Sequence, residues 1–327
     1  MKKISWGIIG CGDVTEIKSG PAFNLIEHSS LISVMRRNAE AAKDYARRHN
    51  VPKWFNDAEM LLNDQDINSI YIATPPSSHV EYACVALENN LNVYLEKPVA
   101  LNANGAKKII QSAKKSSAKI SIAHYRRALP MFQFIGQQLK EKNIGDIRMV
   151  QINLWQAPKP NLVATSKNNW RVDPALSGGG YFHDLAPHQL DLMLLYFGAP
   201  VSCNGFSLNQ SKLYEADDIV CGNIIFEHNI ICNGLWNFSV AENETKDECT
   251  IIGNKGSIRF SFFGKDVRVR DITGEERTYH FEHPKHIQQP MIERVVKYFL
   301  DGGENPCSIN DAVEVMKMMD TFTQRSR

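Results

Sequence analysis

The stretch ISWGIIGCGDVT, residues 4–15, is a short apolar run that passes directly into two glycines and a polar turn. This order is typical of the opening of a dinucleotide-binding βαβ unit. The glycines there allow a tight turn and let backbone N–H groups approach a pyrophosphate at a helix N-terminus. Thr15 stands where the fingerprint has a third glycine or an alanine, so the motif alone leaves an ordinary strand-to-helix turn open. The residues expected to contact the nucleotide are Gly10, Cys11, Gly12, Asp13 and Val14.

Segments typical of strands and helices alternate after this turn. The strand-like segments are 31–35, 67–76, 91–98 and 119–125, and the helix-like segments are 39–49, 78–90 and 104–116. Such alternation predicts a parallel sheet with helices on both faces. Ligands bind these sheets at the carboxyl ends of the strands, where we expect the glycine turn, Thr74-Pro75-Pro76 and Glu96-Lys97-Pro98 to converge.

The second half of the chain is rich in β-branched and aromatic residues, in strand-like runs over 147–155, 201–209, 218–239 and 248–263. Short turns separate several of these runs, which predicts sequential hairpins and a mostly antiparallel sheet. Two helix-like segments, 289–303 and 309–324, follow. The predicted fold class is α/β plus α+β, with a doubly wound Rossmann domain over 1–123 and an open, mostly antiparallel sheet domain over 124–327.

The charge balance limits the partners of the chain. Lys and Arg number 37 against 36 Asp and Glu, a net charge of +1, whereas nucleic-acid and membrane-surface proteins carry a basic excess. No apolar run approaches the roughly 20 residues of a membrane helix. The seven cysteines are scattered, which favours a reducing cytoplasm over a disulfide framework or a zinc site. We therefore expect a small-molecule partner, with no nucleic acid and no membrane.

The end of the second strand-like segment indicates which dinucleotide would bind. Sites that prefer NAD usually place an acid there to accept hydrogen bonds from the ribose 2′-OH. This chain has Arg36 and Arg37 instead, and guanidinium groups suit the 2′-phosphate of NADP. The sequence therefore favours NADP over NAD. It leaves open that the arginines stack on the adenine or face solvent.

A second motif is GGGYFHDLAPHQLD, residues 178–191. Asp184, His188 and Asp191 fall at i, i+4 and i+7, which is one face of a helix. Pro187 is tolerated best in the first helical turn, which predicts a helix that begins close to Asp184. Taken alone, the pattern also allows Asp184 to be an N-cap and His188 a satisfied core histidine.

This motif resembles the Gly-Gly-Gly…Asp-x-x-x-His motif of the glucose–fructose oxidoreductase/inositol dehydrogenase family, called Gfo/Idh/MocA. The resemblance covers nearly the whole chain and includes GIIGCG, residues 73–101, HYRR at 124–127 and NNWRVDPALSGGG at 168–180. Residues 10–23 further resemble a bacterial branch of that family, which does not fix a substrate. The resemblance implies a Rossmann domain joined to an open antiparallel sheet, whose flat face often makes a homodimer or homotetramer contact.

By the same resemblance, Lys97, Asp184 and His188 correspond to the catalytic trio of the family. Oxidation of a secondary alcohol requires removal of the hydroxyl proton as hydride leaves, and a histidine can take that proton. A helix N-terminus would favour neutral His188, whereas Asp184 would favour its imidazolium, and the sequence leaves the outcome open. Lys97 would stabilise developing alkoxide charge or bind the neighbouring hydroxyl.

Other family positions transfer by the same resemblance. Trp170 and Arg171 would lie near the nicotinamide and substrate, and Arg126 would contact the substrate together with the trio. The sequence leaves open that these residues instead pack between the domains. Arg127 departs from the family, which more often has an aromatic residue there. Its guanidinium could favour an acidic sugar or a phosphate, or face water. The remaining residues expected along the cofactor are Thr74, Pro75, His79 and Glu96.

The run HFEHPKH places His280, His283 and His286 three residues apart, which invites a metal interpretation. Pro284 breaks the helix that such spacing would need, so no metal site is predicted.

Three functions fit the sequence. The first is an NAD(P)-dependent oxidoreductase acting on a secondary hydroxyl or carbonyl of a sugar, polyol or derivative. The second is a glycosidase that uses bound NAD for transient oxidation, and the third is a non-catalytic nucleotide or sugar sensor. The presence of all three trio residues favours the first over the third.

Overall fold

The structure is a computed structural model that describes residues 3–163 and 169–324. Residue 168, with which one of the family-like stretches begins, lies outside the described residues. The chain forms two compact units, Met1–Ala128 with Pro284–Val313 and Leu129–His283 with Glu314–Arg327. These units describe which segments pack together. The domain division into 1–123 and 124–327 remains a prediction.

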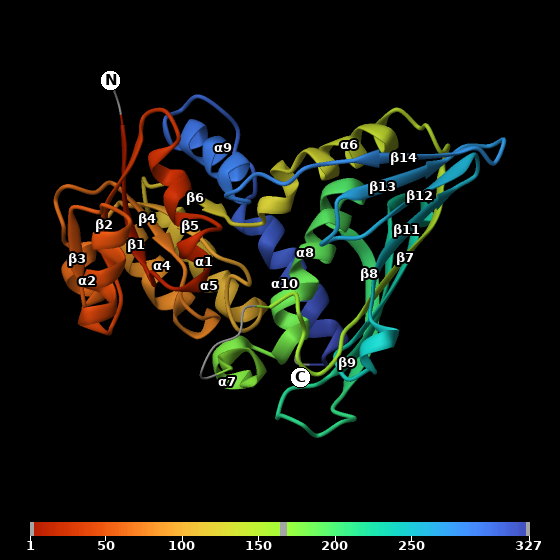
Figure 1. Cartoon of the computed structure of the whole chain (residues 1–327), viewed down its shortest axis with the longest axis horizontal. Helices are drawn as coiled ribbons and strands as arrows, with labels where there is room; N and C mark the ends of the chain where they lie inside the picture. The colour runs from red at the N-terminus through yellow and green to blue at the C-terminus, as the bar shows by residue number, and fades with distance from the viewer. Residues whose placement is uncertain (1–2, 164–168, 325–327) are drawn as a thin grey trace. The chain divides into compact units, whose positions relative to one another are not determined.

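The first unit contains a six-stranded sheet of order β3-β2-β1-β4-β5-β6, in which every pair is parallel (Figure 1). Its strands are β1 (Ile4–Ile9), β2 (Ser29–Met35), β3 (Lys53–Phe55), β4 (Ser69–Ile72), β5 (Asn92–Leu95) and β6 (Ile120–Ile122). Its helices are α1 (Asp13–Glu16), α2 (Ala39–Arg48), α3 (Ala58–Leu62), α4 (His79–Glu88), α5 (Ala103–Lys115) and α9 (Gln289–Phe299). The strand order reverses at β1 and β4, which is where such sheets bind ligands. The predicted Rossmann class is confirmed.

The apolar run 4–9 becomes a central strand because its side chains are buried on both faces of this sheet. Trp6 is fully buried, with its ring 4.8 Å from that of Phe23 and 5.7 Å from that of Phe299. Its indole N–H donates to the Ser29 hydroxyl at 3.0 Å, so the one polar atom of the ring is satisfied. The core of the first unit therefore uses α9, which lies far from β1 in the sequence.

The second unit contains an eight-stranded sheet of order β14-β13-β12-β11-β7-β10-β9-β8. All neighbours are antiparallel except β7 and β10. Its strands are β7 (Ile147–Trp155), β8 (Pro200–Leu208), β9 (Ile219–Phe226), β10 (Ile231–Asn237), β11 (Lys246–Gly253), β12 (Gly256–Phe260), β13 (Asp266–Arg270) and β14 (Glu276–His280). Its helices are α6 (Pro130–Lys140), α7 (Pro174–Ser177) and α8 (Gly180–Phe197), together with the C-terminal part of α10 (Ile309–Phe322). The predicted open, mostly antiparallel sheet is confirmed.

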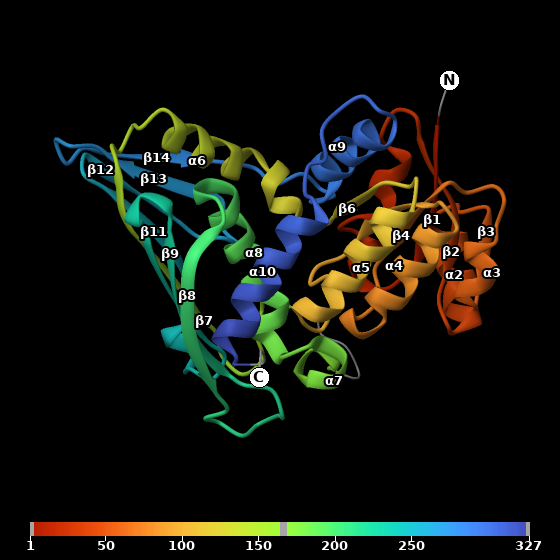
Figure 2. The ribbon, with the colours of Figure 1, turned by 180° about the vertical axis from the view of Figure 1, so that it is seen from behind.

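Helices α6, α8 and α10 cover one face of this sheet, as both ribbon views show (Figure 2). The strands alternate accordingly. In β9, Ile224 and Phe226 are buried whereas Asn223 and Ile225 are exposed. One face of the sheet therefore forms the core of the second unit, and the other faces outward.

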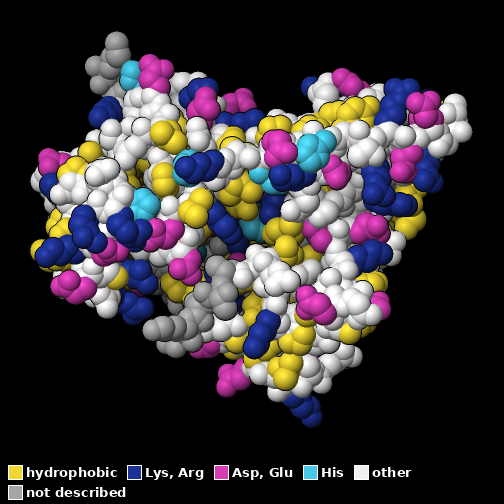
Figure 3. Space-filling view, in the orientation of Figure 1, with side chains coloured by type: hydrophobic (Ala, Val, Ile, Leu, Met, Phe, Trp, Pro, Cys, Tyr) yellow, Lys and Arg dark blue, Asp and Glu magenta, His cyan; other side chains and the backbone are white. Residues whose placement is uncertain are grey.

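Short 3-10 helices lie at Gly20–Asn24, Pro76–Ser78, Tyr125–Ala128, Trp170–Val172, Glu227–Asn229 and Glu242–Glu244. Acidic and basic side chains are interspersed over the face shown in Figure 3, in keeping with the net charge of +1. Within residues 3–163 and 169–324, no helix has the length and apolar character needed to span a bilayer.

Candidate active site

The glycine turn after β1 is built around Gly10, whose φ of +93° suits glycine and strains other residues. A Cβ on Gly10 would lie 2.8 Å from Cγ2 and 2.9 Å from the backbone nitrogen of Thr74, at the end of β4. The N–H groups of Gly10 and Cys11 donate to the carbonyl of Met35, at the end of β2, at 2.9 and 3.2 Å. The turn is therefore held between the carboxyl ends of β2 and β4, the two strands that flank β1.

Gly12 has a different reason to be glycine. A Cβ there would meet only the carbonyl oxygen of Gly10, at 3.9 Å, so the backbone faces open space. This gap leaves room for a diphosphate against the main chain, beside the N–H groups of Asp13 and Val14 in the first turn of α1. The residues present thus fit a dinucleotide. Because α1 is a single turn, it supplies individual N–H groups with little macrodipole.

Cys11 lies in the same turn, between Gly10 and Gly12. Its thiol is buried, and burial raises the pKa of Cys11 to about 11, opposed by the positive charge of Arg36. Arg36 and Arg37 follow β2 directly, and both are exposed. Both arginines therefore lie at the carboxyl end of β2, the strand beside β1 in the sheet.

Thr15, the departure from the glycine fingerprint, forms hydrogen bonds with Gly12 in the turn and with Tyr45 of α2. Its hydroxyl donates to the carbonyl of Gly12 at 2.8 Å, and its own carbonyl accepts the Tyr45 hydroxyl at 2.9 Å. A Cβ on Gly20 would lie 2.2 Å from that carbonyl and 2.2 Å from the Tyr45 oxygen. The Thr15 hydroxyl therefore adds a hydrogen bond within the turn that a glycine there would lack, whereas the contact with Tyr45 uses the backbone.

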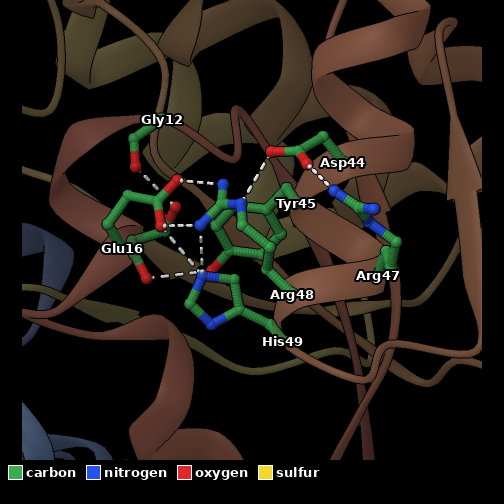
Figure 4. A network of polar contacts seen from close by, with 8 residues as sticks. Gly12, Glu16, Asp44, Tyr45, Arg47, Arg48 and His49 are labelled. Atoms are coloured by element: carbon green, nitrogen blue, oxygen red, sulfur yellow. Dashed lines mark hydrogen bonds and ion pairs between the residues drawn. The ribbon is translucent and has the colours of Figure 1, made fainter.

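Figure 4 shows an ionic network that fixes α1 to α2. Arg48 binds Glu16 through two nitrogens, at 2.7 and 2.8 Å, and also binds Asp44 at 2.6 Å. The ring of His49 lies 2.9 Å from a Glu16 oxygen. The hydrogen bond from Arg48, more than the one from His49, lowers the pKa of Glu16 to about 2.

We expect Glu16→Gln to flatten the loss of thermal stability in acid. The folded-state pKa of about 2 lies below the usual value of about 4.3, so the carboxylate stabilises the fold above pH 4.3 and loses this effect as the pH falls toward 2. Since the side chain is about one-third exposed, the contribution is about 1 kcal/mol or less. The measurement is Tm from pH 7 to pH 2 for wild type, Glu16→Gln and, as a control, Glu304→Gln at an exposed glutamate. If Tm falls with pH equally in wild type and Glu16→Gln, the Glu16 carboxylate does not stabilise the fold as proposed.

His79 contacts the segments that follow β4 and β5. Its ring is fully buried, with one nitrogen 2.7 Å from the carbonyl of Thr74 and the other 2.9 Å from that of Pro98. Burial lowers the pKa of His79 to about 4. The neutral imidazole has one N–H, so it donates to one of these two carbonyls. The ring lies between the segment after β4, which includes the half-buried Pro75, and the segment after β5.

Glu96 and Lys97 follow β5, the neighbour of β4 in the sheet. Glu96 is buried and accepts the Tyr71 hydroxyl at 2.5 Å, the Gln288 amide at 2.6 Å and the backbone N–H of Lys97 at 3.2 Å. Lys97 is half-buried. The Glu96 carboxylate thus holds the backbone from which Lys97 extends.

Arg126 and Arg127 lie in the 3-10 helix Tyr125–Ala128, and both are buried. The Arg126 guanidinium carbon lies 5.3 Å from the centre of the Tyr125 ring. Arg127 binds Asp311 at 2.9 Å. Of the alternatives left open for Arg127, the one in which it faces water is excluded, because its buried guanidinium pairs with Asp311 of α10.

Helix α8 begins at Gly180, earlier than predicted, and Pro187 is its eighth residue. Ser177 replaces the expected cap, since its hydroxyl oxygen accepts the N–H groups of Gly179 and Gly180 at 3.2 and 3.0 Å. The prediction that the helix begins close to Asp184 is therefore wrong. One missing N–H inside a long buried helix is tolerated here.

The earlier start changes the electrostatics of His188, which lies about two turns into α8. The influence of a helix dipole falls off within the first turn, so a dipole effect on His188 is not expected. His188 is buried, and its ring makes a T-shaped contact with that of Phe263, with centroids 5.9 Å apart. Asp191 lies on the same face of α8 and is 1% exposed.

Asp184 is paired with Arg171. The guanidinium Nε lies 3.0 Å from a carboxylate oxygen, and the two side chains are 13% and 16% exposed. The guanidinium carbon of Arg171 also lies 4.6 Å from the centre of the Trp170 ring. The second unit therefore brings Trp170, Arg171, Asp184 and His188 together on and beside α8. The sequence indicated these four residues separately, but not the ion pair or Phe263.

The three histidines at 280, 283 and 286 make separate contacts. His280 binds Asp266 and Glu282, whereas His283 faces the carbonyl of Gly264 and His286 that of Ile17. Across the part of the chain that the structure describes, no three His, Cys, Asp or Glu residues are arranged to hold a metal ion.

Comparisons with known proteins identify the family of the chain. Residues 4–124 match the family model of the oxidoreductase family with an NAD-binding Rossmann fold, and residues 132–259 match the GFO/IDH/MocA C-terminal domain. Oxidoreductase P35 of Formosa agariphila is 46% identical over 320 residues, which cover 98% of each chain. Trans-1,2-dihydrobenzene-1,2-diol dehydrogenase of Xenopus laevis is 30% identical over 85% of this chain and 81% of its own.

Solved structures share the fold. The aldose-aldose oxidoreductase of Caulobacter crescentus superposes with a TM-score of 0.86 over 99% of this chain and 98% of its own, at 20% identity. Levoglucosan dehydrogenase, solved with NADH, gives a TM-score of 0.86 over 98% and 96%, also at 20% identity. The chain belongs to the Gfo/Idh/MocA family of oxidoreductases.

Proposed function

We propose that this oxidoreductase transfers hydride between NADP and a secondary hydroxyl or carbonyl of a sugar, polyol or derivative. The open backbone of Gly12, between the ends of β1, β2 and β4, is the observation that carries the cofactor assignment. The substrate class is supported by relatives whose names include 1,5-anhydro-D-fructose reductase and levoglucosan dehydrogenase.

In the proposed site, the glycine turn holds the diphosphate, and the Arg36 and Arg37 side chains bind the 2′-phosphate. Thr74 and Pro75 line the ribose, with His79 fixing their loop from behind. A bound nicotinamide supplies the hydride acceptor or donor.

His188 takes the hydroxyl proton during oxidation and returns it during reduction. Arg171 satisfies part of the Asp184 charge, so the carboxylate orients substrate or imidazole without standing as an isolated buried anion. Lys97 stabilises the developing alkoxide. Arg126 and Trp170 complete the substrate surface in this proposal.

The test is a turnover screen with NADP⁺, NAD⁺ and their reduced forms against levoglucosan, 1,5-anhydro-D-fructose, trans-1,2-dihydrobenzene-1,2-diol and related polyols, followed at 340 nm. We expect net reduction or oxidation of the cofactor with at least one carbohydrate. Tightly retained NAD⁺ in the purified protein, together with glycoside cleavage and no net redox change, would instead identify the glycosidase.

Cofactor preference gives a sharper prediction. A charge-assisted contact from Arg36 to the 2′-phosphate is worth about 1.5–3 kcal/mol, on the order of ten- to a hundredfold in affinity. Arg36→Asp should therefore weaken NADP⁺ binding by that factor and improve NAD⁺ binding, since the acid repels phosphate and accepts from a ribose diol. The measurement is Kd for both nucleotides at fixed ionic strength, with Lys43→Asp, an exposed charge change on α2, as the control. Wild-type affinity for NAD⁺ equal to or above that for NADP⁺ would end the NADP assignment.

We also propose a homodimer or homotetramer through the outward face of the eight-stranded sheet. This face exposes Phe206 by 59% and Ile231 by 46%, and side-chain amides form a ladder of hydrogen bonds across Asn204, Asn223 and Asn233. Exposed apolar side chains on one sheet face are typical of protein interfaces.

Phe206→Lys combined with Ile231→Lys should convert the oligomer to a monomer, because two buried charges at a subunit contact lack partners. The measurement is mass by light scattering during gel filtration, with Ile272→Lys, at 72% exposure, as the control. A wild-type monomer would refute the interface.

We also propose that the protein works in a reducing cytoplasm, in keeping with seven cysteines that form no disulfide in the described residues.

A further inference from the structure

The loop between β12 and β13 carries the aromatic ring that contacts His188. We call residues 261–264 the Phe263 loop. The Phe263 and His188 rings lie at 83° with centroids 5.9 Å apart, an edge-to-face arrangement within the usual range of roughly 4.5–7 Å. Phe263 is half-buried, whereas His188 is buried. The phenyl ring therefore forms part of the wall against which the imidazole is oriented.

Asp247, on β11, holds one side of this loop. One of its carboxylate oxygens accepts the N–H of Phe262 at 3.1 Å, and the other accepts the N–H of Phe263 at 2.8 Å. The Ser261 hydroxyl donates to the same carboxylate. Three donors on one carboxylate fix the backbone from which the Phe263 ring extends, because charge-assisted hydrogen bonds are short and strong.

His283 holds the other side of the loop. Its Nε2 lies 3.0 Å from the carbonyl oxygen of Gly264, and a carbonyl only accepts, so that nitrogen carries the hydrogen. This histidine is one of the three in the HFEHPKH run. The sequence assigned no role to His283, whereas the structure shows its contact with the Phe263 loop.

We propose that Asp247 and His283 are positioning residues, which fix the Phe263 loop so that its ring holds the His188 imidazole in one orientation. The terminal torsion of histidine is broad, so packing has to select the orientation. Orientation matters because a misplacement of about 1 Å in an active site can lower the rate about a hundredfold. The inference rests on the proposed function in taking His188 as the proton-transfer group.

The first experiment needs no substrate. The full chain is labelled with [¹³Cε1]histidine, and the His188 signal is assigned from the spectrum of His188→Gln. Asp247→Asn replaces one accepting oxygen with an amide that cannot accept, so at least one tie to the loop is lost. Phe263→Leu removes the ring itself. We expect the His188 signal to move in both variants.

A pair of variants at His283 separates positioning from general damage. His283→Ala removes the donor to Gly264 and should move the His188 signal, whereas His283→Gln keeps a donor and should restore it. The matched control is Asp271→Asn, because Asp271 accepts the N–H groups of Thr273 and Glu275, at 2.8 and 3.2 Å, in the β13–β14 hairpin. This control should leave the His188 signal in place. An unmoved His188 signal in both Asp247→Asn and His283→Ala would overturn the proposal.

The second experiment measures kinetics with the substrate that the wild type converts. Levoglucosan and the dihydrodiol are tested with NADP⁺, which accepts hydride, and 1,5-anhydro-D-fructose is tested with NADPH, which donates it. Asp247→Asn and His283→Ala should lower kcat about tenfold while the KM for the cofactor stays within about twofold, and His283→Gln should recover kcat. A moved signal with unchanged kcat supports the positioning and removes His188 from the proposed reaction. The two failures are thereby distinguishable.

Discussion

His188→Ala is expected to lower kcat about a hundredfold or more, with the Kd for the cofactor unchanged. General acid–base catalysis contributes about 10²–10⁴-fold, and the side chain lies on α8 in the second unit, whereas the glycine turn belongs to the first. The measurements are kcat with the converted carbohydrate and cofactor binding by fluorescence. Lys97→Ala should give a loss of similar size, because it removes charge stabilisation of the alkoxide.

Two controls isolate these effects. His280→Ala removes an exposed imidazole from β14, and Lys107→Ala removes an exposed ammonium from α5, so both should retain wild-type kcat. If His188→Ala and Lys97→Ala both turn over near the wild-type rate, the proposed residue roles fail, although the family membership stands.

Gly12→Val is expected to abolish cofactor binding, by about a hundredfold or more in Kd, without lowering Tm. The fold tolerates the side chain, since a Cβ would meet only one oxygen at 3.9 Å and φ is −119°. The same side chain fills the gap assigned to the diphosphate, so it blocks the close approach of the main chain. The measurements are Kd for NADP⁺ and Tm without nucleotide.

Gly10→Ala should show the opposite balance. With φ at +93° and Thr74 Cγ2 at 2.8 Å from the added Cβ, it should lower Tm even without cofactor. Gly303→Val, in an exposed loop, controls for a β-branched residue at a glycine. Wild-type cofactor affinity in Gly12→Val would place the diphosphate elsewhere.

Much of the fold followed from local pattern. The run at 4–9 became β1, and the predicted strand and helix segments up to residue 125 became β2, β4, β5, β6 and the helices α2, α4 and α5. These elements have strong hydrophobic patterning, so their type is readable without neighbours. The short β3 and α3 were not predicted, because a three-residue edge strand carries too little periodicity. Strands β13 and β14 were missed because three of the five residues of β13 are charged, and β14, at the edge of the sheet, has Tyr279 as its one hydrophobic residue.

The candidate site also has features that the sequence predicted and features that only the structure shows. The sequence by itself determined the glycine turn, the arginines after β2 and the shared helix face of Asp184 and His188, since each depends on residues close in the chain. Tertiary structure decided where Arg127 points, through Asp311, whereas the start of α8 depends on the hydroxyl of Ser177, only three residues before Gly180.

Only tertiary structure, too, could bring together groups far apart in the sequence. It paired Arg171 with Asp184, and it placed Phe263 on His188. Hydrogen bonds and ring contacts of this kind act over a few ångströms in space, whatever the separation along the chain. A periodic pattern records which face of an element is buried, but it does not record which partner lies against that face.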